Sequence, residues 1–284
     1  MVLGVTVSEK NIVDALQKAI FKKAEEMLVG KNAVPIQRIK NIDVRLAIPK
    51  ATYLEAKKVA EGAVADVQSL EWFHSNVSME KYQCHVRVTD EAVARNTLAN
   101  QLRLSIDAAA KGLQIAKDKE IFTTLSAGAG QTVAASAAWD ASGATPEDDI
   151  AKAIDKIVSN TYISDTDLKN MNLFVPASLM GFLKKRVEIA NMQVPLERAI
   201  QEEYGITIYY TRQLTSDALL VVKSNETAIH FEYNGADIQT TEQVRIPGVG
   251  IDYIITQYFK TVVIPDSEGS TTSSRICKIT GVKT

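Results

Sequence analysis

Residues that commonly carry chemistry are few and scattered in this chain. The three histidines, His74, His85 and His230, have no second histidine, cysteine or carboxylate at metal-site spacing, so we interpret them as surface or arm residues. The two cysteines, Cys84 and Cys277, are too few and too far apart for a disulfide framework. We interpret both as buried or half-buried thiols, and a disulfide between them, within or between chains, stays open.

Two further patterns could bind phosphate or move protons, and neither has the context that this chemistry needs. The run Gly128-Ala129-Gly130-Gln131-Thr132 follows a predicted helix instead of a strand and lacks the Gly-Lys-Ser/Thr ending of a phosphate-binding loop. The pair Asp148-Asp149 lies at a predicted helix N-terminus, where the helix dipole explains it, and Glu202-Glu203 lies on a polar helix face. We therefore predict no catalytic, cofactor-binding or metal residues; an α+β hydrolase or transferase is the remote alternative.

Composition describes a globular chain with no strong electrostatic preference. The 284 residues are 46% hydrophobic and 23% charged, enough for a sizeable core in one large domain or two lobes. A net charge of −2 argues against a dedicated nucleic-acid binder, which usually has a basic excess. The first residues have no basic segment followed by a long apolar run, and no stretch approaches the roughly 20 apolar residues of a spanning helix. We expect neither a signal peptide nor a membrane partner.

The N-terminal region has the pattern of an amphipathic helix. Ser8 is a plausible N-cap, and Gly30 is a plausible end. Between them apolar residues recur every four positions, at Ile12, Leu16, Ile20, Ala24 and Leu28. This helix is either an ordinary packed element or an arm that docks on a neighbouring copy or on the inner face of an assembly.

Two alternating segments predict a protruding arm. Apolar and polar residues alternate over 41–50 and again over 82–88, with a poorly periodic stretch at 53–72 between them. We interpret the two segments as the strands of one long arm with an irregular tip. Because an isolated two-stranded arm is only marginally stable in water, we expect it to need a partner surface.

The second half of the chain alternates helices and strands. An apolar stripe predicts a helix of about 28 residues over 98–125, far longer than the mean of about 11–12, ended by Gly128 and Gly130. A loop rich in small residues follows over 127–144, and Thr145-Pro146 starts the next helix. The remaining predicted elements are strands at 172–176, 206–210, 219–223, 229–233, 253–265 and 275–282, and helices at 177–186 and ending at 204.

The order of these parts resembles the major capsid protein of the Hong Kong 97 phage family, whose fold encapsulin shells share. Four landmarks carry the resemblance: Val59-Ala60-Glu61-Gly62-Ala63 with the strand at 82–88, the long helix at 98–125, the helix at 149–154 with Asn172-Leu173-Phe174-Val175-Pro176, and the closing strands between 205 and 264. They cover residues 41–282, nearly the whole chain.

The resemblance implies an α+β fold with four parts. These are an N-terminal arm (1–40), an extended hairpin called the E-loop (41–88), a peripheral domain with a long spine helix (89–127 and 227–284) and an axial domain (128–226). It further implies assembly residues on the E-loop and spine, for which we select Val59, Glu61, Gly62, Trp72, Phe73, Leu98, Leu102 and Ile106.

The implied function is structural. Copies would self-assemble as pentamers and hexamers into an icosahedral virion capsid, formed in the host cytoplasm, that encloses a genome without sequence-specific contact. An encapsulin-like nanocompartment shell is the alternative. Some family members crosslink through an E-loop lysine; Lys81 is close to that place but not at it, so we predict no covalent crosslink.

Overall fold

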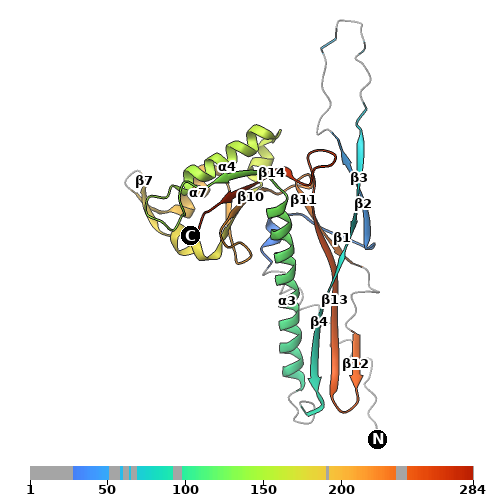
Figure 1. The fold of residues 1–284 in the computed structure, drawn as a ribbon. Coiled ribbons are helices and arrows are strands. Elements are labelled where there is room, and N and C mark those ends of the chain that lie inside the picture. The colour runs from blue at the N-terminus through green and yellow to red at the C-terminus, as the bar shows by residue number, and fades with distance from the viewer. Residues whose placement is uncertain are drawn as a thin grey trace.

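The computed structural model describes residues 28–50, 58–59, 64, 69–91, 98–189, 192–234 and 242–283. Figure 1 shows two lobes and a projecting hairpin. The spine lobe is built on helix α3 and on strands β1, β4, β11, β12 and β13. The head lobe is built on strands β5, β6, β9, β10 and β14. The projecting hairpin, which we call the hairpin arm, consists of strands β2 and β3. The helix predicted from Ser8 to Gly30 lies outside the described residues as far as residue 27.

The spine helix α3 (Leu98–Ala127) confirms the predicted long helix and continues two residues beyond it. At 1.5 Å per residue its 30 residues extend for about 45 Å. Gly128 follows at once, and a Cβ atom there would lie 2.5 Å from Cγ2 of Val263. The helix therefore ends where the chain must pass close to the neighbouring strand, which only glycine permits.

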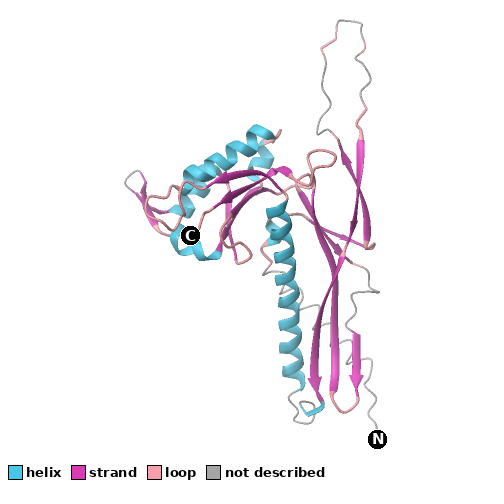
Figure 2. Ribbon diagram, in the orientation of Figure 1, coloured by secondary structure: helices cyan, strands magenta, loops and turns pink. Residues whose placement is uncertain are grey.

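A five-stranded sheet lies beside α3 in the spine lobe (Figure 2). Its longest strand, β13 (Gly250–Val263), pairs antiparallel with ten residues of β4 (Glu80–Thr89), with β12 (Glu242–Ile246) and with β11 (Ala228–Tyr233). Strand β1 (Ile36–Ile39) adds to β11 in parallel. The strands predicted at 229–233 and 253–265 are therefore confirmed, whereas β1 and β12 were not predicted.

The hairpin arm corrects one prediction. Strand β2 (Asp43–Pro49) pairs antiparallel with β3 (Trp72–Ser78), not with the segment 82–88, which belongs to β4 in the spine-lobe sheet. Alternation identified both strands correctly but carried no information about their partners. Only Trp72 of β3 falls in the irregular stretch predicted at 53–72, and residues 73–78 were assigned to no strand.

The head lobe is a five-stranded sheet in the order β5-β14-β10-β6-β9, with helices α4 (Pro146–Asn160) and α7 (Leu196–Tyr204) packed on one face. Its strands are β5 (Ala129–Ala134), β14 (Ser273–Thr280), β10 (Ala218–Val222), β6 (Met171–Pro176) and β9 (Thr207–Thr211). A small hairpin of β7 (Arg186–Ile189) and β8 (Met192–Pro195), helix α5 (Asp165–Lys169), the 3-10 turn Ala177–Leu179 and the single-turn helix α6 (Met180–Leu183) complete it.

Both faces of the head-lobe sheet are covered. All five residues of β10 are buried; Leu220 faces α4 and α7, whereas Leu219 and Val221 face the C-terminal end of α3. On that second face Phe122 of α3 packs edge-on against Phe174 of β6, with ring centroids 5.2 Å apart. This second apolar cluster joins the head lobe to the spine helix.

Two sequence interpretations of the head lobe were wrong. Residues 129–134, predicted as loop, form β5, whose small and polar residues give little strand signal but which pairs in parallel with β14. The helix predicted over 177–186 ends at Leu183, and Arg186 already begins β7. The helix starting at Pro146, the helix ending at Tyr204 and the buried strand at 172–176 are confirmed.

Candidate assembly surfaces

The hairpin arm has one anchored end and one free end. Near its base, Val44 and Leu46 of β2 and Val77 of β3 pack against Phe231 and Tyr233 of the spine-lobe sheet. Its outer end extends beyond both lobes in Figure 1. The arm is thus held by the body of its own subunit at one end only.

Apolar side chains are exposed on the outer part of the arm. Trp72 at the start of β3 is 52% exposed, and Val59 and Val64 between the strands are 46% and 92% exposed. Phe73, the next residue along β3, is half-buried. Single exposed apolar residues are ordinary, but this set gathers on one thin projection, which is typical of an interaction surface.

Two ion pairs of Lys50 hold the arm at the point where β2 ends and β3 begins. Lys50 Nζ lies 3.1 Å from Glu71 on the opposite strand and 3.0 Å from Glu268 in the loop after β13. The Lys50 backbone N–H also donates to the Glu71 carbonyl at 2.8 Å. Hydrogen bonds to Glu268 and Glu71 raise the pKa of Lys50, which keeps its charge. These exposed pairs orient the arm more than they stabilise the fold.

The outer face of the spine helix also exposes large apolar residues. Leu104 is 63% exposed and Ile115 is 60% exposed. Leu98, Leu102 and Ile106, selected from the sequence, all lie in α3, but their side chains fall outside the described part of the structure. Glu61 and Gly62 are outside it altogether, and the assembly role of all eight selected residues stays a prediction.

A buried polar cluster joins the inner face of α3 to the sheet. Lys117 Nζ donates to Glu232 Oε1 at 2.7 Å, and Arg38 Nε donates to Glu232 Oε2 at 3.1 Å. Glu120 accepts from the Thr261 backbone N–H at 2.8 Å, and Thr261 Oγ1 lies 2.9 Å from His230 Nδ1. Lys117 is 4% exposed, so one α3 cation is locked to β11 away from water.

His230 corrects the sequence interpretation of the histidines. His74 and His85 are exposed, as expected, but His230 is fully buried on β11 and faces α3. Alternation placed it on a strand without showing that both faces of that strand are covered. Its pKa is lowered to about 4, mainly by burial; the nearby Glu232 acts upward and Lys117 acts downward. The imidazole is therefore neutral at physiological pH.

The pKa values of the two carboxylates in the same cluster are shifted in opposite directions. Burial raises the pKa of Glu120 more than the hydrogen bonds from Thr261 lower it. For Glu232 burial also acts upward, but the Lys117 charge and hydrogen bond outweigh it and leave the pKa below its ordinary value. The difference follows from the cation at 2.7 Å, and it makes Glu232 the fixed negative charge of the cluster.

Asp149 in the head lobe has a larger structural role than its helix-end position suggests. It is fully buried and accepts from the Ser136 backbone N–H at 3.0 Å, Ser136 Oγ at 3.2 Å and Trp139 Nε1 at 3.1 Å. The carboxylate ties the segment after β5 to the first turn of α4. All its described partners donate to it, so Asp149 acts as a buried structural acceptor.

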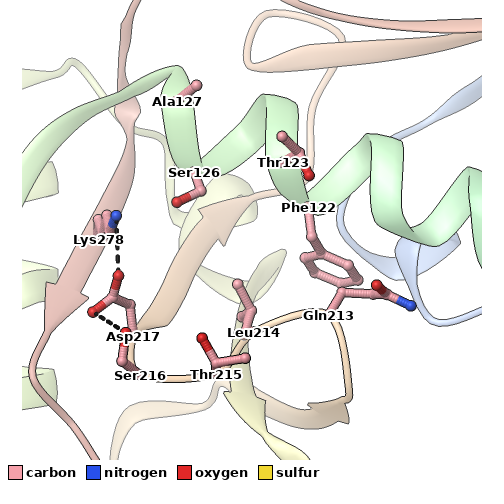
Figure 3. Close-up of a pocket in the computed structure, with 10 residues that line it drawn as sticks. All are labelled: Phe122, Thr123, Ser126, Ala127, Gln213, Leu214, Thr215, Ser216, Asp217 and Lys278. Carbon is pink, nitrogen blue, oxygen red and sulfur yellow. Dashed lines mark hydrogen bonds and ion pairs between the residues drawn. The ribbon is translucent and has the colours of Figure 1, made fainter.

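The hollow between the two lobes offers no catalytic arrangement. Figure 3 shows it beside the C-terminal end of α3, where about 360 Å³ is lined by Phe122, Ser126 and the loop at 213–217. Its charged groups, Asp217 and Lys278, lie 3.0 Å apart and neutralise each other. Burial would raise the pKa of Asp217, but hydrogen bonds from Lys278 and the Gly281 N–H bring it below its ordinary value.

The run at 128–132 begins one residue before β5 (Ala129–Ala134), and its glycines have a packing explanation. A Cβ atom on Gly130 would lie 2.6 Å from the Ser273 carbonyl group, so this glycine allows β5 and β14 to approach.

Both cysteines are free thiols: Cys277 is buried in the head lobe and Cys84 is half-buried on β4. Across the described ranges, no three His, Cys, Asp or Glu side chains gather as metal ligands. The helices described there include none long and apolar enough to cross a membrane.

A long helix on a long sheet, a separate five-stranded lobe and a projecting hairpin define a shell-forming capsid protein with the Hong Kong 97-like fold. Comparisons with known proteins agree. The sequence model of the phage capsid protein family matches residues 75–270, and the chain belongs to that family. Family and fold together indicate a structural protein and a location in a capsid or virion. No curated protein sequence matches the chain.

Solved structures share the fold at low sequence identity. The virus-like particle from Pyrococcus furiosus is 12% identical with a TM-score of 0.64, covering 93% of this chain and 98% of that one. A phage-related protein from Bordetella bronchiseptica RB50 is 12% identical, covering 93% and 96%, with a TM-score of 0.62. The holo-SrpI encapsulin complex from Synechococcus elongatus is 10% identical, covering 87% and 85%, with a TM-score of 0.55. The α+β fold class and the resemblance stated from the sequence are confirmed.

Proposed function

We propose that this chain is the major capsid protein of a virus or provirus, and that its copies form pentamers and hexamers that close into an icosahedral shell. The observation that carries the proposal is the hairpin arm, whose outer apolar residues Trp72, Val59 and Val64 are exposed in the single subunit. The family match supports a shell, and the arm supplies a means of joining its subunits.

The arm would contact the body of the next copy. Burying apolar surface contributes about 25 cal/mol per Å², so covering the exposed faces of Trp72 and its neighbours stabilises the contact. We assign the same role to Val59, Glu61, Gly62 and Phe73 on the arm, and to Leu98, Leu102 and Ile106 on the receiving spine. Such a contact joins two different surfaces, so repeating it closes a ring, and many modest interfaces then act together.

The four-part division also stays a proposal, with two boundaries moved. Because β4 pairs along β13, we end the extended hairpin at Ser78 and assign residues 79–88 to the peripheral domain. Likewise β1 pairs with β11, so an N-terminal arm would end before residue 36. The head lobe corresponds to the axial domain and would surround the centres of the pentamers and hexamers.

The near-neutral net charge of the chain supports a shell that does not bind its enclosed genome specifically. With a net charge of −2 the chain lacks the basic excess with which proteins usually bind nucleic acid, so we propose that the shell encloses its genome without sequence-specific contact. Assembly would take place in the host cytoplasm. The encapsulin-like alternative shares the fold and is favoured by the likeness to the holo-SrpI complex. Neighbouring genes and the extracted contents, nucleic acid or protein, distinguish the two.

Shortening the arm tests the proposal. The Lys50 N–H donates to the Glu71 carbonyl, so these residues form a ready closing pair for a tight turn. Replacing residues 51–70 by Asn-Gly keeps the β2–β3 pairing and removes the tip. We expect folded subunits that no longer assemble, seen as loss of shells in negative-stain images and elution as a small species in size-exclusion chromatography.

A length-matched control separates reach from contact. Replacing residues 51–70 by a Gly-Ser linker of the same length preserves reach but removes Val59 and Val64. We expect this variant also to lose assembly, because the apolar contacts are gone. Intact shells from the Asn-Gly variant would overturn the proposed role of the arm, and unassembled wild-type protein under all conditions would overturn the shell itself.

A further inference from the structure

A short segment lies between the spine lobe and the head lobe and contacts both. It consists of residues 28–34, which include the 3-10 turn Gly30–Asn32, and we call it the wedge. Ala33 and Val34 are 1% and 0% exposed. Their side chains belong to the same apolar cluster as Phe122 of α3 and Phe174 of β6. The wedge is therefore part of the contact between the two lobes.

The spine lobe binds the N–H side of the wedge. Asp118 of α3 accepts from the backbone N–H groups of Gly30 at 2.7 Å and Val29 at 3.3 Å. A Cβ atom on Gly30 would lie 2.7 Å from Cδ1 of Ile121 on the same helix. The wedge thus lies so close to α3 that any side chain at position 30 would displace it.

The head lobe binds the carbonyl side of the same turn. Lys223, the residue after β10, donates from Nζ to the Lys31 carbonyl at 2.7 Å. Asn172 of β6 donates from Nδ2 to the Asn32 carbonyl at 2.8 Å. A helical turn has partial positive charge at its N–H end and partial negative charge at its carbonyl end. The two lobes therefore bind opposite ends of one turn, each with side chains of the matching polarity.

These contacts are shielded from water. Burial raises the pKa of Asp118 more than its bonds to Gly30 and Val29 lower it. Burial, together with the charge of Lys31, lowers the pKa of Lys223. Removing the partner of a buried charge is costly, and hydrogen bonds have a preferred direction, whereas apolar contact has none. The polar contacts of the wedge can therefore fix an orientation that the apolar cluster alone leaves adjustable.

We propose that the wedge fixes the angle between the spine lobe and the head lobe, and that this angle sets the curvature at which copies of the chain assemble. With the head lobe at a ring centre and the spine lobe directed away from it, a change of angle would tilt neighbouring rings. The effect on curvature rests on the proposed shell. The fixed angle does not, because all of its contacts lie within one subunit.

Spin-label distances in the full-length chain test the fixed angle. Labels attached at Ala108→Cys on α3 and Tyr162→Cys on the head lobe report on the two lobes, since both positions are exposed. All variants carry Cys84→Ser and Cys277→Ala, so that only the introduced thiols react. Dilution with unlabelled protein restricts the measured distance to one chain. We expect a single narrow distance distribution when the wedge is intact.

Removing the head-lobe donors should release the angle. Lys223→Met with Asn172→Leu should broaden the distribution about twofold, because the lobes can then rotate about their junction. The matched control is Lys156→Met with Asn160→Leu. It removes a lysine bond and an asparagine bond to backbone carbonyls, at 2.6 Å and 2.7 Å, that lie wholly within the head lobe. An unchanged width in the junction variant, or equal broadening in both variants, would overturn the proposal.

A second variant acts from the spine side and applies even where the first does not fold. Gly30→Ala places a methyl group against Ile121 and should shift or broaden the distance; adding Ile121→Val removes the nearest atom and should restore part of the change. A distribution identical to wild type in Gly30→Ala would contradict the fixed angle.

Shell diameter separates this inference from the proposed function. Shells of the Lys223→Met, Asn172→Leu variant should show more than one diameter in negative-stain images. One uniform diameter despite broadened distances would overturn the link to curvature. Wild-type protein that forms no shell would overturn the proposed function, while the distances would still decide whether the wedge fixes the angle.

Discussion

The two five-stranded sheets of this molecule are covered in different ways. The head-lobe sheet is apolar on both faces, with every residue of β10 buried between α4, α7 and the end of α3. The spine-lobe sheet packs apolar residues against the base of the arm, but it meets α3 partly through Lys117, Glu120, His230 and Glu232. The head lobe is therefore held together by apolar packing, whereas in the spine lobe buried polar contacts fix how α3 lies on the sheet.

Geometry explains the difference. A round lobe encloses much volume per unit of surface, so apolar packing suffices to stabilise it. The spine lobe is one helix lying beside one sheet, and little of it is far from water. Buried ion pairs add little net stability, but breaking one is costly, so they fix which residues of α3 face which strand.

The largest expected effect comes from breaking that pairing. Lys117→Met leaves Glu232 buried without its nearest cation, and we expect unfolding to become easier by about 3–5 kcal/mol. Urea unfolding of the arm-shortened subunit measures this. The double variant Lys117→Met with Glu232→Leu should recover most of the loss. A single-variant loss below about 1 kcal/mol would show that the spine lobe does not depend on this pair.

Apolar truncation should affect the head lobe more than the arm. Leu220→Ala removes a fully buried side chain of β10 and should cost about 2–5 kcal/mol, including the cavity that it leaves. Leu46→Ala, at a half-buried position of β2, should cost less than about 1 kcal/mol in the same unassembled subunit. Equal losses in urea unfolding would contradict the view that the arm is incompletely covered in one subunit.

Acid should weaken the spine lobe through His230. The buried residue has a pKa of about 4, against about 6.5 in the unfolded chain, so the unfolded state takes up the proton first as the pH falls. Stability should therefore decrease by about 2 kcal/mol between pH 7 and pH 5 from this residue. Glu120, whose pKa is raised by burial, acts in the opposite direction and reduces the net slope.

Comparing variants isolates the histidine contribution. His230→Asn should remove that part of the pH dependence, whereas His74→Gln, on the exposed side of the arm, should leave it unchanged. The measurement is the free energy of unfolding of the arm-shortened subunit at the two pH values. An identical pH slope in wild type and His230→Asn would rule out His230 as its source.

The smallest effect on folding is expected at the outer end of the arm. Trp72 is 52% exposed, so Trp72→Ser should change subunit stability by no more than about 0.5 kcal/mol. Shell yield in negative-stain images should nevertheless fall, since the side chain would lose its contact on the neighbouring copy. Tyr162→Ser, at another exposed aromatic residue, is the control; an equal fall in yield would remove the distinction between arm and head lobe.

Sequence patterns predicted elements well and partners poorly. The α3 stripe, the Thr145-Pro146 helix start and the apolar strand at 172–176 identified their elements because period and end signals are local. Which strands pair is not contained in any local pattern: β2 pairs with β3, and β4 pairs with β13, which lies more than 150 residues further along the chain. β5 was missed because Ala129 and Gly130 have weak strand preference.

The assembly role of the selected residues stays a prediction, and the exposure of two of them fits it. Trp72 and Val59 are exposed on the arm, as a contact role requires, and alternation with a poorly periodic tip was the signal that located them. The buried role of His230 and the clamp formed by Asp149 were not visible in the sequence. Both depend on which element covers a strand or a helix end, and that is decided by the three-dimensional packing.

Strand β13 has a mechanical consequence. Ten consecutive residues of β13 pair antiparallel with β4, and the hydrogen bonds run across the strand direction. A pull along the length of the strand therefore loads all of these bonds together, in shear, whereas a pull at right angles opens them one after another. Tension directed along the lobe, such as pressure from packed contents would create in a closed container, meets the subunit in its most resistant direction.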